Sequence, residues 1–178
     1  MGVAITGGRL ASHVIPIKSV GSAVWRKREI FVDSRMEGDI AMKERNTLTD
    51  TDRCRLGQLL MSDDARGLAP WQVRDKLECM LEDAYAIQSE SIPDDVVTMN
   101  STVLLVNVTS ATEFICTIVY PEDVDLVDEG ISVLEPLGTR LIGCEVGDLV
   151  EWESRSEPGP WRIAEILFQP ERVGNFAL

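Results

Sequence analysis

The sequence lacks the features that mark membrane, secreted and metal-binding proteins. Its apolar runs fall far short of the roughly 20 residues that a membrane-spanning helix needs, and its start does not follow the basic, apolar, small-residue order of a secretory signal. It has a single histidine, His13, and no C-x-x-C pair. We therefore expect a cytoplasmic protein with no membrane span, no metal and no other cofactor, whose cysteines are reduced and mostly buried: Cys54, Cys79, Cys116 and Cys144.

Catalytic motifs and basic residues are also scarce. The chain contains no G-x-S-x-G, no P-loop and no G-x-G-x-x-G, and no histidine follows His13 to serve as a base. The net charge is −13, and residues 46–178 carry nine basic against 25 acidic side chains. Such a surface repels a phosphate backbone. We therefore predict a non-enzyme that binds nucleic acid indirectly at most and suits a basic groove on another protein.

Residues 1–45 differ from the rest of the chain. They carry eight basic against five acidic side chains and show no sustained apolar period. Met42 is followed by a sequence that would itself make a plausible start. We expect this segment to be a flexible extension, or to result from a start site placed upstream of the true one.

Residues 46–90 have a helical pattern. A first helix is expected from Leu48, and Pro70 suits the first turn of a second helix. Apolar residues of the second helix follow a 4, 3, 4, 3 spacing that is typical of a coiled-coil seam: Val73, Leu77, Met80, Ala84 and Ile87. The sequence therefore predicts a short antiparallel helical hairpin whose tip holds Asp63 and Asp64.

Residues 94–178 have a β pattern. Five short segments are rich in branched and aromatic residues: "TVLLVNV", "EFICTIVY", "ISVL", "DLVEWE" and "WRIAEILF". One helical insertion, "PLGTRLIG", interrupts them, and Gly143 is expected to end it. We predict an α+β fold in which an antiparallel sheet of about five strands is covered by one short helix.

Four ordered blocks of this region resemble a known family: "DDVVTMNSTV" (94–103), "TIVYPEDVD" (117–125), "ISVLEPLGTRLIGCEVGDLVEW" (131–152) and "FQPERVGNF" (168–176). They are similar to the C-terminal domain of the GreA/GreB transcription factors, and specifically to the Rnk branch, named for regulation of nucleoside diphosphate kinase. The resemblance implies an FKBP-like fold for residues 94–178 and binding to bacterial RNA polymerase near its secondary channel. A link to nucleoside diphosphate kinase would be indirect.

The resemblance also assigns a contact loop. Glu135 and Pro136 precede the short helix, where Gre-type domains present a loop that contacts polymerase. The family commonly has serine before this proline and Ala-Leu inside the helix, whereas this chain has Glu135 and Arg140-Leu141. The position of the loop is therefore implied more strongly than its individual contacts.

The length of the hairpin separates two interpretations of its tip. In Gre factors a long coiled coil carries acidic residues into the polymerase, where they help to hold a catalytic magnesium ion. Each arm here is expected to have about 15 residues, or about 22 Å, roughly half the Gre length. Asp63 and Asp64 could serve as paired magnesium ligands, but the short arms favour their role as solvated turn residues.

The leading hypothesis is therefore a regulator that binds RNA polymerase, competes with Gre factors and does not stimulate transcript cleavage. One alternative is a cleavage factor of the full Gre type. Another is an FKBP-like peptidyl-prolyl isomerase, because a fold does not fix an activity. Its aromatic cleft would have to draw on Phe114, Tyr120, Trp152, Trp161, Phe168 and Phe176.

Overall fold

The computed structural model describes residues 46–153 and 157–176. The predictions for residues 1–45, including a start at Met42, lie outside the described residues. All described residues belong to one compact unit, Ile40–Leu178. Within the described residues, no helix is long and apolar enough to cross a membrane.

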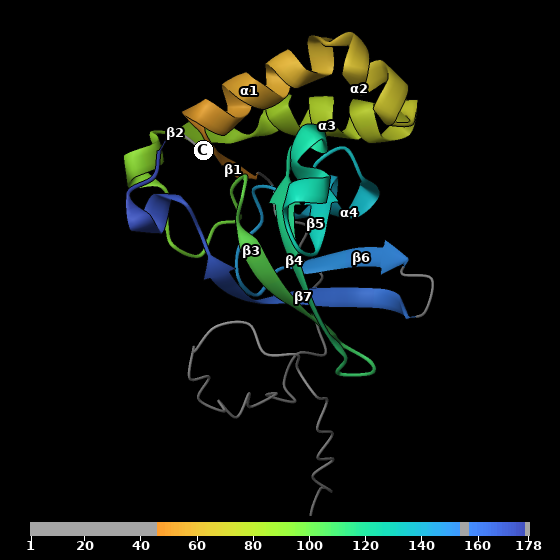
Figure 1. The fold of residues 1–178 in the computed structure, drawn as a ribbon. Helices are drawn as coiled ribbons and strands as arrows, with labels where there is room; N and C mark the ends of the chain where they lie inside the picture. Colours follow the sequence, from red (N-terminus) through yellow and green to blue (C-terminus); the bar gives the residue numbers. More distant parts are fainter. Residues whose placement is uncertain (1–45, 154–156, 177–178) are drawn as a thin grey trace, which may run out of the picture. The chain divides into compact units, whose positions relative to one another are not determined.

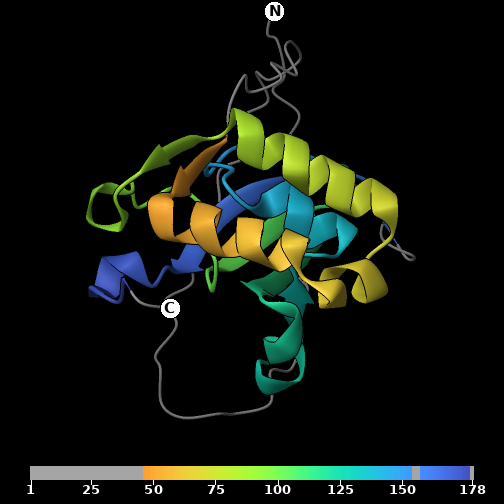
Figure 2. The ribbon, with the colours of Figure 1, turned by 90° about the horizontal axis from the view of Figure 1, so that it is seen from above.

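Three helices form one side of this unit (Figure 1). They are α1 (Asp50–Met61), α2 (Asp63–Leu68) and α3 (Trp71–Asp83). The Thr49 side chain caps α1, because its Oγ1 accepts a hydrogen bond from the backbone N–H of Asp52 at 2.9 Å. Figure 2 shows α3 returning alongside α1. The two long helices have 12 and 13 residues, fewer than the 15 that the sequence suggested.

The ends of this helical region differ from the prediction. Leu48 lies in a strand, β1 (Thr47–Thr49), and Ile87 lies in β2 (Tyr85–Ile87). β1 and β2 pair in parallel, with Leu48 opposite Ala86. Ile87 is therefore not part of the helical seam, since α3 stops at Asp83 and the chain becomes extended at Ala84 to pair with β1. The predicted seam is shortened to positions before Ala84.

The five predicted strands form one curled sheet in the order β5-β4-β3-β7-β6. Their bounds are β3 (Thr102–Asn107), β4 (Glu113–Val119), β5 (Gly130–Ser132), β6 (Leu149–Glu153) and β7 (Pro158–Phe168). β3, β4, β6 and β7 pair antiparallel, but β5 is parallel to β4. The prediction of an all-antiparallel sheet is wrong at this edge. The 3-10 helix η2 (Pro121–Leu126) returns the chain so that β5 runs in the direction of β4.

The predicted short helix is α4 (Pro136–Leu141). It ends two residues before Gly143, which follows the Ile142 cap as expected and has a φ of +77°, a left-handed conformation that suits glycine. Two further 3-10 turns, η1 (Ser89–Ser91) and η3 (Glu171–Val173), flank the sheet region. The α+β prediction therefore agrees with the observed architecture, a curled and mainly antiparallel sheet with helices on it.

One apolar core joins the helices to the sheet. Its members come from α1, α3, α4 and the sheet and include Leu56, Leu77, Leu105, Leu141 and Ile163, all fully buried. Burying aliphatic side chains of this size supplies about 1.5–3 kcal/mol each. The helices are consequently held against the sheet, and α4 lies between them (Figure 1).

Candidate protein-docking site

The predicted contact loop is exposed and rigidly built. Glu135 and Pro136 are exposed, and Pro136 occupies the first turn of α4, where its missing N–H costs nothing. The Glu135 carboxylate accepts a hydrogen bond from the Ser132 N–H at 3.3 Å. The backbone N–H of Glu135 donates a hydrogen bond to the Ser132 carbonyl at 2.9 Å. Two hydrogen bonds thus join Ser132 to Glu135 and close the turn, and the Glu135 side chain remains exposed.

Buried hydrogen bonds and close packing with α4 also support this loop. The Thr139 hydroxyl donates to the Val133 carbonyl at 2.6 Å, and the Ser132 hydroxyl accepts from the Leu134 N–H at 3.1 Å. Gly138 is needed for close approach, because a Cβ placed there would lie 2.2 Å from the Ser132 carbonyl oxygen. α4 therefore packs directly on the loop backbone and fixes the orientation of Glu135.

The predicted tip residues lie on a different element. Asp63 is the first residue of α2, so it begins a short helix at the place where the sequence suggested a turn. It is exposed and forms an ion pair with Arg66 at 3.1 Å. Asp64 also lies in the first turn of α2, and its side chain is outside the described residues. Among the described residues, no group of three or more His, Cys, Asp or Glu side chains is placed to hold a metal ion.

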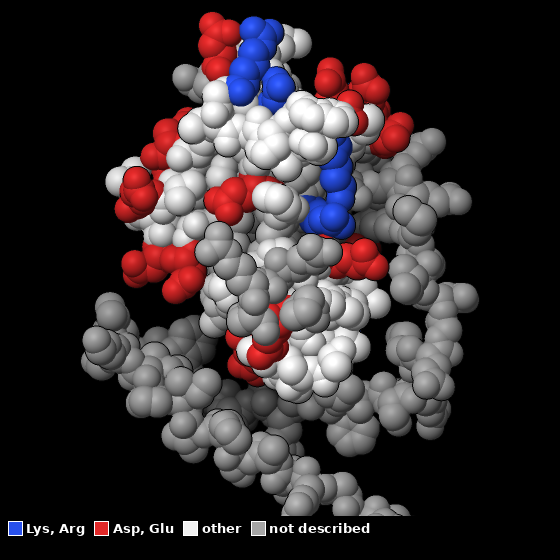
Figure 3. All heavy atoms as spheres, turned by 90° about the vertical axis from the view of Figure 1, so that its right-hand side faces the viewer, with Lys and Arg blue, Asp and Glu red and all other residues white. Residues whose placement is uncertain are grey.

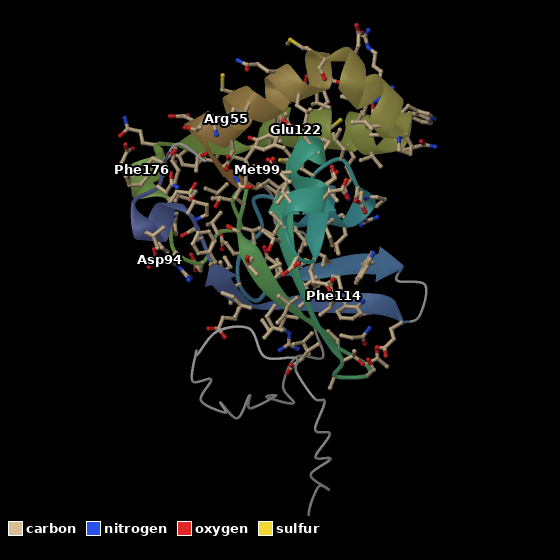
Figure 4. The ribbon with its side chains drawn as sticks, in the orientation of Figure 1. Arg55, Asp94, Met99, Phe114, Glu122 and Phe176 are labelled. Atoms are coloured by element: carbon tan, nitrogen blue, oxygen red, sulfur yellow. The ribbon has the colours of Figure 1, made fainter. Side chains whose placement is uncertain are left out.

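A groove that the sequence did not predict runs between α1 and η2. It encloses about 770 Å³ and is lined by Arg55, Gln58, Leu59, Ser62, Leu68, Tyr120, Pro121 and Glu122. Figure 4 labels Arg55 on the α1 side and Glu122 on the η2 side. The second wall of the groove is η2, and its sequence signal is Pro121 followed by acidic residues, a pattern that is typical of a helix start. The groove thus depends on the 3-10 helix η2 for its second wall.

A buried polar junction lies beneath α1. Asp52 is 2% exposed and accepts a hydrogen bond from the Met99 N–H at 3.2 Å. Thr98 beside it donates to the Glu171 carboxylate at 2.8 Å. Burial raises the pKa of Asp52 to about 6, and the charge of Glu171 adds to this increase. Burial also raises the pKa of the Tyr120 hydroxyl, which lines the groove.

The aromatic residues do not form an open cleft. Phe114, Trp152 and Trp161 pack on one another, with ring centroids 5.0 to 6.4 Å apart. Trp161 is 3% exposed, so it belongs to the core. Figure 4 shows Phe114 at the end of the sheet away from the helices, whereas Tyr120 lines the groove. The aromatic residues considered for an isomerase cleft are therefore divided between separate places.

The cysteines correct one expectation. Cys54 and Cys79 are exposed, Cys144 is half-buried and only Cys116 is buried. All four are free thiols, but the prediction that most are buried is wrong. The two exposed cysteines lie on the outer faces of α1 and α3, which the helical period alone did not separate from the core positions.

Sequence comparisons match this chain to a transcription-factor family model and to two known proteins. The family model for "Transcription elongation factor, GreA/GreB, C-term" matches residues 92–168. The chain is 33% identical over 135 residues to the "Regulator of nucleoside diphosphate kinase" of Escherichia coli K12, covering 74% of this chain and 95% of that protein. It is 28% identical over 94 residues to the "Transcription elongation factor GreA" of Thermodesulfovibrio yellowstonii, covering 53% of this chain and 60% of that one.

A solved structure agrees with the fold. The chain is similar to the "Prokaryotic transcription elongation factor GreA/GreB" from Nitrosomonas europaea, with 40% sequence identity and a TM-score of 0.60. The match covers 71% of this chain and all of that one. The arrangement of helices and curled sheet described above is therefore one that a solved relative also has.

Proposed function

Because this chain belongs to the Rnk branch of the GreA/GreB family, we propose that it regulates transcription by docking on bacterial RNA polymerase near the secondary channel. The docking surface is the loop before α4, with Glu135 and Pro136 at its centre. The sheet and α4 (residues 94–178) form the FKBP-like docking part, and residues 46–90 form the hairpin above it. Such a role would place the chain in the cytoplasm.

The rigidity of the loop carries this proposal. Protein surfaces that bind without rearrangement lose less conformational entropy on association. The Glu135 carboxylate is held by the Ser132 N–H, and Gly138 fixes α4 against the same backbone. An exposed carboxylate on such a support suits a basic surface on the partner.

The short helices support regulation without transcript cleavage. With 12 and 13 residues, α1 and α3 are about 18–20 Å long, at 1.5 Å per residue. The arms of Gre factors are roughly twice this length, as the family resemblance implies. A tip at this distance cannot reach the active centre from the same docking site. We infer that the protein competes with Gre factors and leaves cleavage unstimulated.

Two binding variants test the docking loop. Glu135→Lys is expected to weaken binding to core RNA polymerase at least tenfold, because it reverses a charge that faces a basic surface. Glu135→Gln is the matched control: it keeps the side-chain oxygen that accepts from Ser132 and removes only the charge. It should weaken binding less and keep the thermal unfolding midpoint. Equal affinities of Glu135→Lys and the wild type would exclude this loop from the interface.

A competition assay tests the regulatory part of the proposal. Increasing amounts of the wild-type protein should displace a labelled Gre factor from core polymerase and suppress Gre-dependent cleavage of a stalled transcript. The protein alone should give no cleavage above the level of polymerase without factors. Cleavage stimulated by this chain, and lost in Asp63→Ala, would instead support the full Gre type.

The isomerase alternative has less support. Prolyl isomerases of the FKBP type need an open aromatic cleft, whereas Trp161 is buried against Phe114 and Trp152. The relatives described above are named as a regulator and as elongation factors. A prolyl-peptide assay with the full chain should show no acceleration over the uncatalysed rate.

A further inference from the structure

The sheet has a second face, on the side opposite its core. On the central strand β3, Val103 and Leu105 belong to the core, so the alternate residues point to the other side. The hydroxyls of Thr102 and its β4 partner Thr117 lie 2.9 Å apart on that side, since directly paired residues share a face. We call this side the outer face and define it by six residues: Leu104, Val106, Glu113, Ile115, Arg162 and Phe168.

The central strand is apolar on both faces. An antiparallel sheet with one solvated face usually alternates apolar and polar residues. β3 instead reads Thr-Val-Leu-Leu-Val-Asn, and Leu104 and Val106 on the outer face are half-buried. On the neighbouring strands, Ile115 is 47% exposed and Phe168 is 40% exposed. This pattern is typical of a sheet whose second face is covered by another surface.

Two opposite charges flank this apolar centre in one row of the sheet. Val106 pairs with Glu113 of β4 on one side and with Arg162 of β7 on the other. The three residues therefore lie in a line, with the acid and the base each one strand spacing, about 4.8 Å, from β3. Glu113 is exposed and Arg162 is half-buried, and no ion pair joins either of them to another described residue. Both charges are thus available to a partner.

This placement makes the outer face complementary to itself. A two-fold axis along β3, in the plane of the contact, exchanges the two sides of the face. Arg162 of each copy then lies over Glu113 of the other copy. An axis at right angles to β3 would instead place Arg162 over Phe168 and pair no charges. The axis along β3 also keeps the strands of the two sheets nearly aligned, as stacked sheets prefer.

The overall charge gives this complementarity its weight. The chain has a net charge of −13, and Figure 3 shows carboxylates spread over one side of the molecule with few basic side chains among them. Two copies therefore repel one another at long range. A contact between copies is most favourable where each supplies a base for the acid of the other, as the outer face does.

We propose that the outer face binds a second copy of this chain, so that Arg162 of each copy pairs with Glu113 of the other in a two-fold symmetric dimer. The inference goes beyond the proposed function, because it assigns a partner to a surface other than the loop before α4. A face three strands wide, at about 4.8 Å per strand, is small beside the roughly 800 Å² per partner of a standard interface. We therefore expect a reversible dimer in the micromolar range.

Charge reversal tests this contact. Sedimentation equilibrium of the full chain measures the dimer dissociation constant of the wild type, Arg162→Glu and Glu113→Arg. Each variant alone brings like charges together twice in its homodimer and should dimerise at least about tenfold more weakly. A mixture of the two variants should recover nearly the wild-type affinity, because every pair across the contact again joins an arginine to a glutamate. Pairing within one chain cannot produce this recovery.

The matched control is Glu165→Arg, which makes the same change of charge as Glu113→Arg. Glu165 pairs with Leu104 in the next row, where Ile115 lies on the other side of β3. The proposed axis therefore places Glu165 over Ile115 and not over a charge, so this control should dimerise at least as well as the wild type. Thermal unfolding of every variant checks the fold; both glutamates are exposed, so their variants should keep the wild-type midpoint.

Each of four results would overturn the dimer as proposed. The first is a wild type that sediments as a monomer at every concentration. If Arg162→Glu then weakened binding to core RNA polymerase, the outer face would belong to polymerase. The second is a wild-type dimer that survives both reversals, and the third is a mixture that does not recover. The fourth is an equal loss with Glu165→Arg and Glu113→Arg, which would exclude the axis along β3.

Discussion

The loop before α4 and the tip of the helices are both exposed, yet the chain builds them in opposite ways. In the loop, backbone and side-chain hydrogen bonds between Ser132 and Glu135 close the turn, and Gly138 lets α4 pack directly on it. At the tip, α2 is anchored by Ala65, while Leu68 and Trp71 lie in solvent. The loop is tied to the core by hydrogen bonds and close packing, whereas the exposed side chains of the tip add little buried surface.

This difference explains why the two regions should respond differently to substitution. A fixed carboxylate gives register and orientation, because its position cannot adapt to the partner. Exposed apolar side chains gain free energy only when a partner removes them from water. Changes to the buried support of the loop should therefore reduce stability, and changes to exposed side chains at the tip should leave stability almost unchanged.

The largest expected effect is that of Gly138→Ala. The new Cβ would lie 2.2 Å from the Ser132 carbonyl oxygen and 2.9 Å from the Val133 Cα, both backbone atoms that cannot move aside independently. We expect a loss of about 4 kcal/mol or more in the free energy of unfolding, measured by urea denaturation. The matched control is Gly57→Ala in α1, where nothing lies within 4 Å of the new Cβ. This control should gain roughly 0.5–1 kcal/mol; similar stabilities of both variants would contradict the close packing of α4.

The next largest effect concerns Asp52 and is pH-dependent. Its folded-state pKa is raised to about 6 from an ordinary value of 3.8, so the folded protein holds this proton more tightly than the unfolded chain does. The group therefore lowers stability as the pH rises from about 4 to about 6, by about 3 kcal/mol in total. Above that range the cost is constant.

Asp52→Asn isolates this contribution. Asparagine keeps an oxygen that can accept from the Met99 N–H but has no carboxyl proton to lose. The difference in unfolding free energy, wild type minus variant, should fall as the pH is raised from 4 to 7. A difference that stays constant over this range would show that Asp52 titrates normally. The buried junction at Asp52 would then contribute no pH dependence to the stability in this range.

Much of the sheet region could be predicted because its signals are local. Branched and aromatic runs located β3, β4, β6 and β7, and proline located the start of α4. The parallel pairing of β5 could not be predicted, because Gly130–Ser132 is too short to show a period and its partner is chosen by the path of η2. The same limit hid β1 and β2, so Leu48 and Ile87 were assigned to helices.

The features of the candidate site could be predicted only in part, and the role of the loop stays a prediction. The family resemblance located Glu135 and Pro136 in the sequence, but only the structure shows the Ser132 hydrogen bond that fixes the carboxylate. The groove beside α1 requires Tyr120 and Leu59 to face each other across elements far apart in the chain. The outward position of Leu68 was also hidden, because an amphipathic pattern predicts that leucine is buried and alanine exposed.

A smaller effect on stability is expected at the tip. Asp63→Ala removes an exposed ion pair with Arg66, and exposed pairs of this kind contribute well under about 1 kcal/mol. Thermal and urea unfolding should therefore be almost unchanged. Leu77→Ala, at a fully buried position of α3, should instead cost about 2–5 kcal/mol. A large loss with Asp63→Ala would mean that the tip is held as firmly as the loop.

The smallest perturbation is chemical labelling, which compares the two regions without a substitution. Cys54 on α1 and Cys79 on α3 are exposed, whereas Cys116 is buried in β4. Burial raises the pKa of the Cys116 thiol to about 12, so very little reactive thiolate exists at neutral pH. A maleimide at pH 7 should modify Cys54 and Cys79 within minutes and Cys116 only after global unfolding in urea, as read by peptide mass spectrometry. Labelling of Cys116 at the rate of Cys54 would show that the sheet opens as readily as the helices, and the contrast between a fixed loop and a weakly supported tip would be lost.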